Sequence, residues 1–204
     1  MYIDLSLPLR DNMPVYPGDP AVQILPAATF AEQGYSGHDM HIGNHTGTHI
    51  DAAAHMIEGG QTIDQYPLEQ FFGRCSYIPY EQTLDQSRFA ELDIRAGDIV
   101  VIDTGMWTKF ESPEYFTDYP VITTVFAEYV AAQNVHMIGL DTCSVDNADG
   151  FPVHKILLGS GILVAENLTN VTELKDKKFT ITALPISCRL DAAPARILAT
   201  SVDE

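Results

Sequence analysis

The stretch HIGNHTGTHIDAAAH, residues 41–55, concentrates imidazole and carboxylate groups within a short length of chain. The protein has seven histidines, and five of them fall between residues 38 and 55. Imidazole nitrogens beside a carboxylate are the ligands that a transition-metal site in a protein requires. The stretch therefore predicts a metal site, and the other features of the sequence are interpreted in relation to that site.

His45, His49 and Asp51 form the pattern HxxxHxD within this stretch. Two imidazole nitrogens and one carboxylate oxygen suit zinc, manganese or iron(II) better than calcium or copper(I). In a straight strand the two histidines would lie roughly 13 Å apart, which is the limit of what one ion can bridge. Gly47 between two threonines is poor helix material. We therefore expect the chain to bend near Gly47 and to fold His45 back toward His49.

The remaining histidines of the stretch have different interpretations. His55 follows Asp51 after an alanine triplet. It could be a further ligand, or a general acid and base beside the metal. For His38 and His41 we favour ordinary half-buried residues that make hydrogen bonds.

The composition limits the classes of partner. The chain of 204 residues carries 28 acidic and 11 basic residues, a net charge of −17. Nucleic acid and anionic membranes are therefore not expected as partners, because both need a basic face. The three cysteines, Cys75, Cys143 and Cys188, form no CxxC pair and fit a reducing compartment. The N-terminus lacks a secretory signal and the longest apolar run, residues 156–165, is half a membrane span. We expect a cytoplasmic protein.

Short strand-like runs outnumber helical ones along the chain. Runs that favour strands occupy residues 2–7, 22–27, 75–80, 98–104, 135–142, 162–167, 179–186 and 195–200. Apolar spacing predicts helices over 123–134 and 152–159, with Pro152 suited to a first turn. The sequence thus predicts an α/β fold. We expect one domain, residues 1–204, with a mixed, strand-rich sheet and a few short helices.

The segment MPVYPGDP, residues 13–20, is expected to be irregular, because it holds three prolines and a Pro-Gly step. It places Tyr16 on a loop that could lie over a pocket. The plainer interpretation is a surface turn with a half-buried tyrosine.

HTGTHIDAAAH, residues 45–55, resembles the motif HxGTHxDxPxH of the metal-dependent hydrolases called the cyclase family. Ala53 stands where that family has proline. The match lies in His45, Gly47, Thr48, His49, Asp51 and His55. Further segments agree in the same order, at residues 4–9, 13–20, 97–107, 139–146, 154–171 and 183–199. The resemblance covers nearly the whole chain and implies a swivelling β/β/α-like fold.

The resemblance also implies a second group of ligands far down the chain. In the cyclase family a histidine is followed twelve residues later by a glutamate, and His154 and Glu166 stand at that spacing. A carboxylate within an apolar run is rarely buried unless it is paired or bound to metal. One ion would then be held by His45, His49 and Asp51. A second would be held by Asp51 and His154, with Glu166 shared between them.

Within the family, the length and these segments most resemble the bacterial kynurenine formamidases. The resemblance implies hydrolysis of an aryl formamide such as N-formyl-L-kynurenine by a metal-activated water. His55 would then carry a proton to the leaving amine. Zinc is the expected metal, with one or two ions per subunit and manganese as the alternative. Tyr16 and Trp107 are candidate substrate-binding residues, although a core position for Trp107 is an equal alternative.

Two rival interpretations stay open. A ring-opening enzyme resembling isatin hydrolase would use the same attack on an aryl amide, so the histidine motif cannot separate the two. A divalent-metal-binding protein without catalysis is the other rival. His55 argues against it, because a protein that only binds metal needs no free base beside the ion. The resemblance further implies a homodimer or a higher homo-oligomer.

Overall fold

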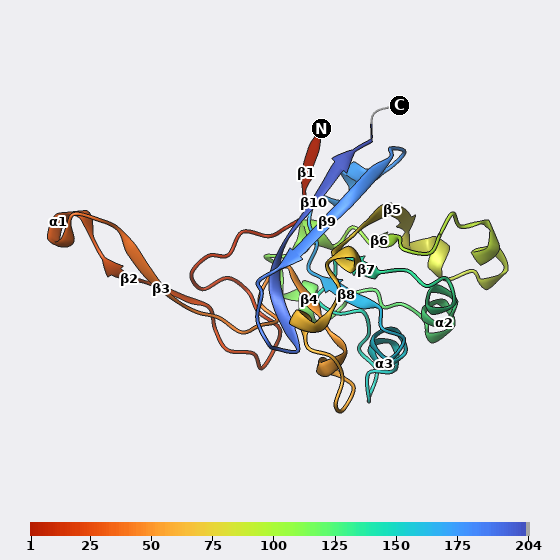
Figure 1. The fold of residues 1–204 in the computed structure, drawn as a ribbon, viewed down its shortest axis with the longest axis horizontal. Coiled ribbons are helices and arrows are strands. Elements are labelled where there is room, and N and C mark those ends of the chain that lie inside the picture. Colours follow the sequence, from red (N-terminus) through yellow and green to blue (C-terminus); the bar gives the residue numbers. More distant parts are fainter. Residues whose placement is uncertain (203–204) are drawn as a thin grey trace.

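The protein is built around a sheet that closes on itself (Figure 1), as described by a computed structural model covering residues 1–202. The strands of this sheet are β1 (Tyr2–Asp4), β4 (His49–Asp51), β5 (Phe72–Pro79), β6 (Ile99–Asp103), β7 (Met137–Leu140), β8 (Leu163–Glu166), β9 (Phe179–Pro185) and β10 (Ala192–Ser201). They are ordered β1-β10-β4-β8-β7-β6-β5-β9, and β9 also pairs with β10. The strands from β10 round to β9 therefore form a closed barrel, with β1 added beside β10.

The pairing of the strands is mixed, as predicted. β5, β6, β7 and β8 run parallel to one another, whereas β4, β9 and β1 pair antiparallel to their neighbours. β10 closes the barrel because it is long enough to serve several partners: Ala192–Pro194 pair with β4, and Ala195–Ser201 pair with β9. Each of the eight predicted strand-like runs overlaps an observed strand.

Apolar side chains form one core inside the barrel and another outside it. Along β8, Leu163 and Ala165 belong to the inner core, while Val164 belongs to the outer one. This alternation follows from the two-residue period of a strand. The outer core is covered by α2 (Thr124–Ala132) and α3 (Pro152–Gly159), both predicted, and α3 begins at Pro152 as expected (Figure 1).

Many connections contain short stretches of 3-10 helix. These are η1 (Ala53–His55), η2 (Ile63–Gln65), η3 (Leu68–Phe71), η4 (Tyr80–Thr83), η5 (Gln86–Glu91), η6 (Met106–Lys109), η7 (Pro113–Phe116) and η8 (Val171–Leu174). Among the described residues no helix combines the length and the apolar character needed to cross a membrane.

A two-stranded arm extends away from the barrel (Figure 1). It consists of β2 (Gln23–Ala28) and β3 (Gly37–His41), with the short helix α1 (Phe30–Gln33) at its tip. The sequence predicted β2 but not β3. His38 and His41 lie on β3 and are exposed, so the expectation that they are half-buried was wrong.

Candidate metal centre and cavity

Strand alternation and register place three of the predicted ligands on one face of the barrel. His49 and Asp51 alternate with Ile50 on β4, and Ile50 belongs to the core inside the barrel. His49 lies directly opposite Glu166 on the neighbouring antiparallel strand β8. Since side chains alternate across a strand, His49, Asp51 and Glu166 all project from the outer face. All three are nearly or completely buried, because α3 and the loops cover this face.

His45 reaches this face because the chain bends at Gly47, as predicted. Gly47 has a φ of +61°, a conformation that side-chain-bearing residues rarely adopt. A Cβ here would also meet Leu9 at 3.2 Å and crowd the loop packed on the bend. The rings of His45 and His49 lie 5.1 Å apart, and His45 Nδ1 is 2.9 Å from Asp51 Oδ1.

His154 enters the same cluster from the first turn of α3. Asp146 accepts hydrogen bonds from the backbone N–H groups of Val153 and His154 at 2.8 and 3.2 Å, and its other oxygen lies 3.3 Å from His154 Nδ1. The opposite nitrogen, His154 Nε2, faces Glu166 Oε1 at 3.2 Å and Asp51 Oδ2 at 3.8 Å. Asp146, which the sequence did not single out, thus orients the ring toward the cluster.

The centre of the cluster contains buried polar atoms whose only neighbours are other candidate ligands. Asp51 is 0% exposed, and its carboxylate oxygens and His49 Nε2 have no hydrogen-bond partner outside the cluster, although His45 Nδ1 and His49 Nε2 lie 2.9 and 3.3 Å from Asp51 Oδ1. Burying such groups without compensation is costly, and a bound cation removes that cost. Among the described residues, ligand atoms lie within 4.8 Å of one another in three groups: His45, His49 and Asp51; Asp51, His55 and His154; and His45, His55 and Asp191. The residues present therefore fit a divalent metal ion of the zinc and manganese type.

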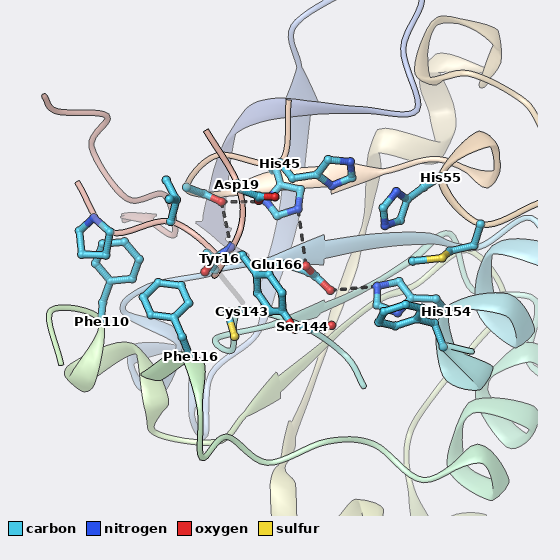
Figure 2. A pocket seen from close by; sticks show the side chains of 17 residues that line it. Tyr16, Asp19, His45, His55, Phe110, Phe116, Cys143, Ser144, His154 and Glu166 are labelled. Carbon is cyan, nitrogen blue, oxygen red and sulfur yellow. Dashed lines mark hydrogen bonds and ion pairs between the residues drawn. The ribbon is translucent and has the colours of Figure 1, made fainter. Parts of the chain in front are cut away.

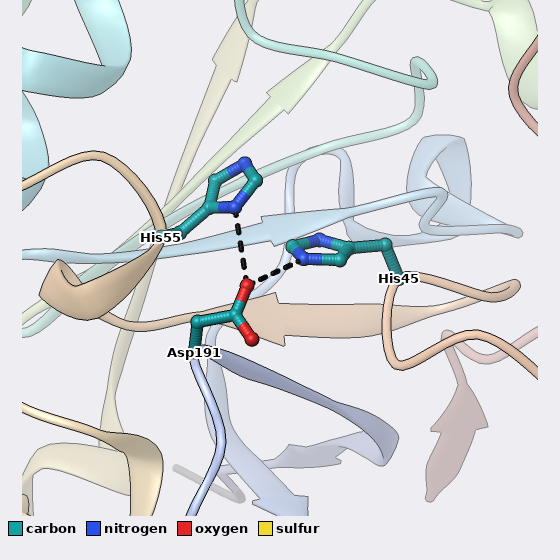
Figure 3. Close-up of side chains that lie close together, drawn as sticks. All are labelled: His45, His55 and Asp191. Carbon is teal, nitrogen blue, oxygen red and sulfur yellow. Dashed lines mark hydrogen bonds and ion pairs between the residues drawn. The ribbon is translucent and has the colours of Figure 1, made fainter. Parts of the chain in front are cut away.

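His55, at the end of η1, shares a carboxylate with His45 (Figure 3). Asp191 Oδ2 lies 3.0 Å from His45 Nε2 and 3.3 Å from His55 Nδ1. Asp191 Oδ1 accepts a hydrogen bond from Asn44 at 2.8 Å, and its backbone carbonyl accepts one from Ala52 at 2.8 Å, which fixes it in place. Burial lowers the pKa of His55. Asp191 lies immediately before β10, far from the histidine motif, and the sequence interpretation missed its role.

Two of the other histidines hold their protons tightly in the metal-free cluster. Burial would lower the pKa of His45, but contacts with Asp51 and Asp191 outweigh it and raise the pKa to about 9. Burial opposes protonation of His154 as well, yet Asp146 and the other buried carboxylates raise its pKa to about 10. At neutral pH both imidazoles are therefore cationic until a metal displaces their protons.

The cluster forms one end of a cavity of about 260 Å³ (Figure 2). His55, His154 and Glu166 mark that end. The cavity is lined by Pro14, Val15, Tyr16, Asp19, His45, Gly47, His49, His55, Met56, Phe110, Phe116, Cys143, Ser144, Phe151, His154, Glu166 and Asn167. The loop over residues 13–20 thus lies over a pocket, and Tyr16 contributes to its wall.

Trp107, the other candidate for substrate binding, does not reach this cavity. It packs against the core inside the barrel, and its indole N–H donates to Thr172 Oγ1 at 3.2 Å. The structure therefore agrees with the alternative of a core aromatic residue for Trp107.

The protein has the fold of a closed, mixed barrel, and its candidate site of histidines and carboxylates lies on the outer face of that barrel. The sequence model of the Cyclase family matches residues 3–147. The chain therefore belongs to the cyclase family.

Similar proteins extend over almost the whole chain. An uncharacterized protein of Methanocaldococcus jannaschii is 31% identical, with 92% of this chain and 93% of the relative covered. Proteins named kynurenine formamidase from Salinibacter ruber and Geobacillus thermodenitrificans are 30% and 28% identical. They cover 95% and 96% of this chain, and 94% and 95% of their own lengths.

Solved structures share the fold. A potential metal-dependent hydrolase with cyclase activity superimposes with a TM-score of 0.80 at 28% identity, covering 100% of this chain and 99% of its own. Isatin hydrolase A from Labrenzia aggregata superimposes with a TM-score of 0.86 at 21% identity, covering 100% of this chain and 94% of its own. The similarity to isatin hydrolase A, at 21% identity, concerns the fold alone.

Proposed function

We propose that the protein is a metal-dependent amidohydrolase that cleaves an aryl amide, with aryl formamides such as N-formyl-L-kynurenine as the substrate class. The observation that carries this proposal is the buried cluster, in which Asp51 is surrounded by other candidate ligands while a further histidine, His55, is held beside it by Asp191. The relatives named kynurenine formamidase support the choice of substrate class.

The proposed ligands are those that the cluster brings together. They are His45, His49, Asp51, His154 and Glu166, which offer nitrogen and oxygen atoms to one or two zinc or manganese ions. When bound, a divalent ion supplies Lewis acidity and lowers the pKa of a water molecule to near neutrality.

His55 is the proposed proton carrier. Its Nδ1 donates to Asp191, which accepts only, so the other ring nitrogen, Nε2, is left as a base at the cavity. The lowered pKa keeps this ring neutral at pH 7 and ready to take up a proton. His55 then delivers that proton to the nitrogen of the departing arylamine. The aromatic wall of the cavity holds the ring of the substrate.

The two rival functions differ in what they require of this site. A protein that only binds metal has no need for a neutral histidine that is oriented by a carboxylate, so Asp191 and His55 favour catalysis. Ring opening of isatin needs the same groups as formamide hydrolysis. The two reactions are therefore separated by assay.

We also propose that the protein forms a homodimer through its arm. Phe30 and Tyr35 at the tip are 74% and 60% exposed, and Leu25 and Met40 are exposed on the strands. Such an arm buries little apolar surface in a single copy, and a second copy would cover it. Sedimentation velocity tests this proposal: a monomeric wild-type protein at micromolar concentration would contradict it.

The test of the proposed function uses protein stripped of metal and then reconstituted with zinc or manganese. N-formyl-L-kynurenine and isatin serve as parallel substrates. Metal-dependent release of formate and kynurenine would support the proposal. Opening of isatin alone would assign the protein to the ring-opening reaction. Stoichiometric metal binding with no turnover of any aryl amide would contradict an amidohydrolase.

A further inference from the structure

Asn167 is the first residue beyond the pairing of β4 with β8. The last pair in that register joins His49 to Glu166, the residue immediately before Asn167. Asn167 has a φ of +57°, a left-handed conformation that asparagine adopts more readily than most other residues with a side chain. This conformation turns the backbone away from β4, and the Asn167 N–H donates to the carbonyl of Thr142 at 2.9 Å. Contact with the histidine stretch is therefore left to the other polar groups of Asn167.

These groups reach the bend at Gly47. Asn167 Nδ2 donates to the Gly47 carbonyl at 3.0 Å, and the Asn167 carbonyl accepts a hydrogen bond from Thr48 Oγ1 at 2.6 Å. Asn167 is 6% exposed, so water competes little for these partners. Two hydrogen bonds thus tie Asn167 to two successive residues of the bend.

The same Gly47 carbonyl orients the ring of His49. His49 Nδ1 lies 2.8 Å from the carbonyl oxygen, and Nδ1 must carry a hydrogen because a carbonyl only accepts. The other ring nitrogen, Nε2, faces Asp51 Oδ1 at 3.3 Å and Glu166 Oε2 at 3.5 Å. Metal-binding histidines commonly donate one ring N–H to a carbonyl, which fixes the direction of the nitrogen that binds the ion. The Gly47 carbonyl is therefore placed to do this for His49.

Tyr115, on η7, fixes the orientation of the Asn167 amide. The Gly47 carbonyl requires the NH2 group to face it, so the amide oxygen faces the opposite way. The hydroxyl of Tyr115 donates to that oxygen at 2.9 Å, and Tyr115 is 0% exposed. A flipped amide would place its oxygen against the Gly47 carbonyl, with two acceptors in contact and no hydrogen between them. The amide is thus held in the orientation that supports the bend.

We infer that Asn167 is a positioning residue for metal binding: it holds the Gly47 carbonyl so that His49 presents Nε2 to the ion. Tyr115 supports this role by orienting the amide. Asn167 also lines the cavity, but the role assigned to it acts through His49 and needs no contact with a substrate. The inference rests on the proposed function for His49 as a metal ligand, and it is independent of which amide is hydrolysed.

Asn167→Gly is the main test, because glycine accepts the left-handed backbone and only the side chain is lost. We expect the affinity for zinc, measured by competition with a chromophoric chelator, to fall about tenfold. Asn170→Gly is the matched control and should leave the affinity unchanged. Asn170 also has a φ of +57° and donates from Nδ2 to a backbone carbonyl, that of Asp4, at 2.9 Å, but it lies outside the cavity lining. Unchanged affinity in Asn167→Gly, or the same fall in both variants, would overturn the inference.

Tyr115→Phe tests the route through the amide without changing Asn167. It removes one hydroxyl group and should weaken zinc binding about threefold. In the Asn167→Gly background the same substitution should have no further effect on zinc affinity, because the amide that the hydroxyl orients is already absent. A loss of equal size in both backgrounds would show that Tyr115 acts by another route and would contradict its assigned role.

Hydrogen exchange of the His49 Nδ1–H reports on the ring itself. Selective 15N labelling of histidine gives the ring signals, with zinc added, and His49→Gln identifies the one from residue 49. Exchange in Asn167→Gly should be about tenfold faster than in the wild type or in Asn170→Gly. Absence of zinc binding in the wild type would show that the proposed metal site is wrong, and the exchange rates would then still decide whether Asn167 positions His49. Equal rates in Asn167→Gly and the wild type would overturn the inference.

Discussion

The two ends of the cavity are built in different ways. The cluster end sits on strands and on the first turn of a helix, and its central residue, Asp51, is 0% exposed. The aromatic end, with Phe110 and Phe116, sits on loops and short 3-10 helices, and Tyr16, on the loop over the cavity, is 39% exposed. Strand register and burial fix the residues of the cluster end. Residues of the aromatic end can be replaced without disturbing the barrel. The comparison suggests that the chemistry is set by the sheet and the selection of substrate by the loops.

Asp51→Ala should have the largest effect, because it removes the carboxylate at the centre of the cluster. We expect loss of bound metal and a fall in activity of about a thousandfold or more, since leaving the surrounding histidines unpaired is also costly. Metal analysis after gel filtration measures the first effect. Asp39→Ala, on the exposed arm, is the control. Full metal content in the Asp51 variant would exclude its role as a shared ligand.

His55→Ala should lower turnover by about two orders of magnitude or more while metal content stays close to that of the wild type. This outcome would show that His55 transfers protons and that other residues of the cluster end bind the metal. His136→Ala serves as the control, because His136 is a half-buried histidine outside the cavity lining. Turnover at the wild-type rate would remove His55 from the mechanism, and loss of metal would make it a ligand.

Lower pH should weaken metal binding at the cluster end. The pKa values of about 9 for His45 and about 10 for His154 mean that both are protonated in the metal-free protein at pH 7. Each proton displaced on binding changes the apparent affinity by about tenfold per pH unit. We expect about a hundredfold loss between pH 7 and 6 when both histidines become ligands. Calorimetry in two buffers of different ionisation enthalpy counts the protons, and release of none would contradict the prediction.

Asp191→Asn should have an intermediate effect. The amide can no longer accept hydrogen bonds from both His45 and His55 through the same charged oxygen, so the two rings lose their common orientation. We expect kcat to fall about tenfold at saturating metal, with a weaker affinity for the ion. An unchanged kcat together with unchanged metal affinity would show that the carboxylate plays no part in positioning.

Tyr16→Ala should give the smallest effect, because it changes only the loop over the cavity and none of the cluster residues. We expect KM to rise severalfold with little change in kcat, which is the signature of lost uniform binding. Tyr16→Phe keeps the ring and should stay close to the wild type. A large fall in kcat for Tyr16→Ala would mean that the two ends are not independent.

Most elements of the barrel were predictable because they carry a local signal, whereas the three-residue strand β4 was not among the predicted strand-like runs. The strand-like runs and the two helices have characteristic residues and spacing, and the bend at Gly47 followed from the distance that a straight strand would impose. The grouping of His154 and Glu166 with the histidine motif was implied by the family resemblance. In the structure the register of β4 against β8 places Glu166 opposite His49, and the first turn of α3 brings His154 against Glu166.

Other features of the site and the fold could not be predicted from the residues next to them in the sequence. Asp191 lies 136 residues from His55, and the two meet only because the start of β10 pairs with β4. Asp146 lies in a segment that resembles the cyclase family, but nothing in that segment indicated that it would orient His154. The strand β3, GHDMH, is poor in the residues that favour strands, and it forms by pairing with β2. Such long-range pairing overrides local preference.

The candidate site can form only after β10, the strand that closes the barrel, has been synthesised. β10 provides an antiparallel neighbour of β4, and Asp191 immediately precedes β10. A nascent chain whose β10 has not yet been synthesised therefore has its histidine motif without one of the two partners that hold β4 in register. Domains of this kind, rich in pairings between distant segments, fold late. Under the proposed function, the complete set of metal ligands would therefore be held in place only after β10 has joined the barrel.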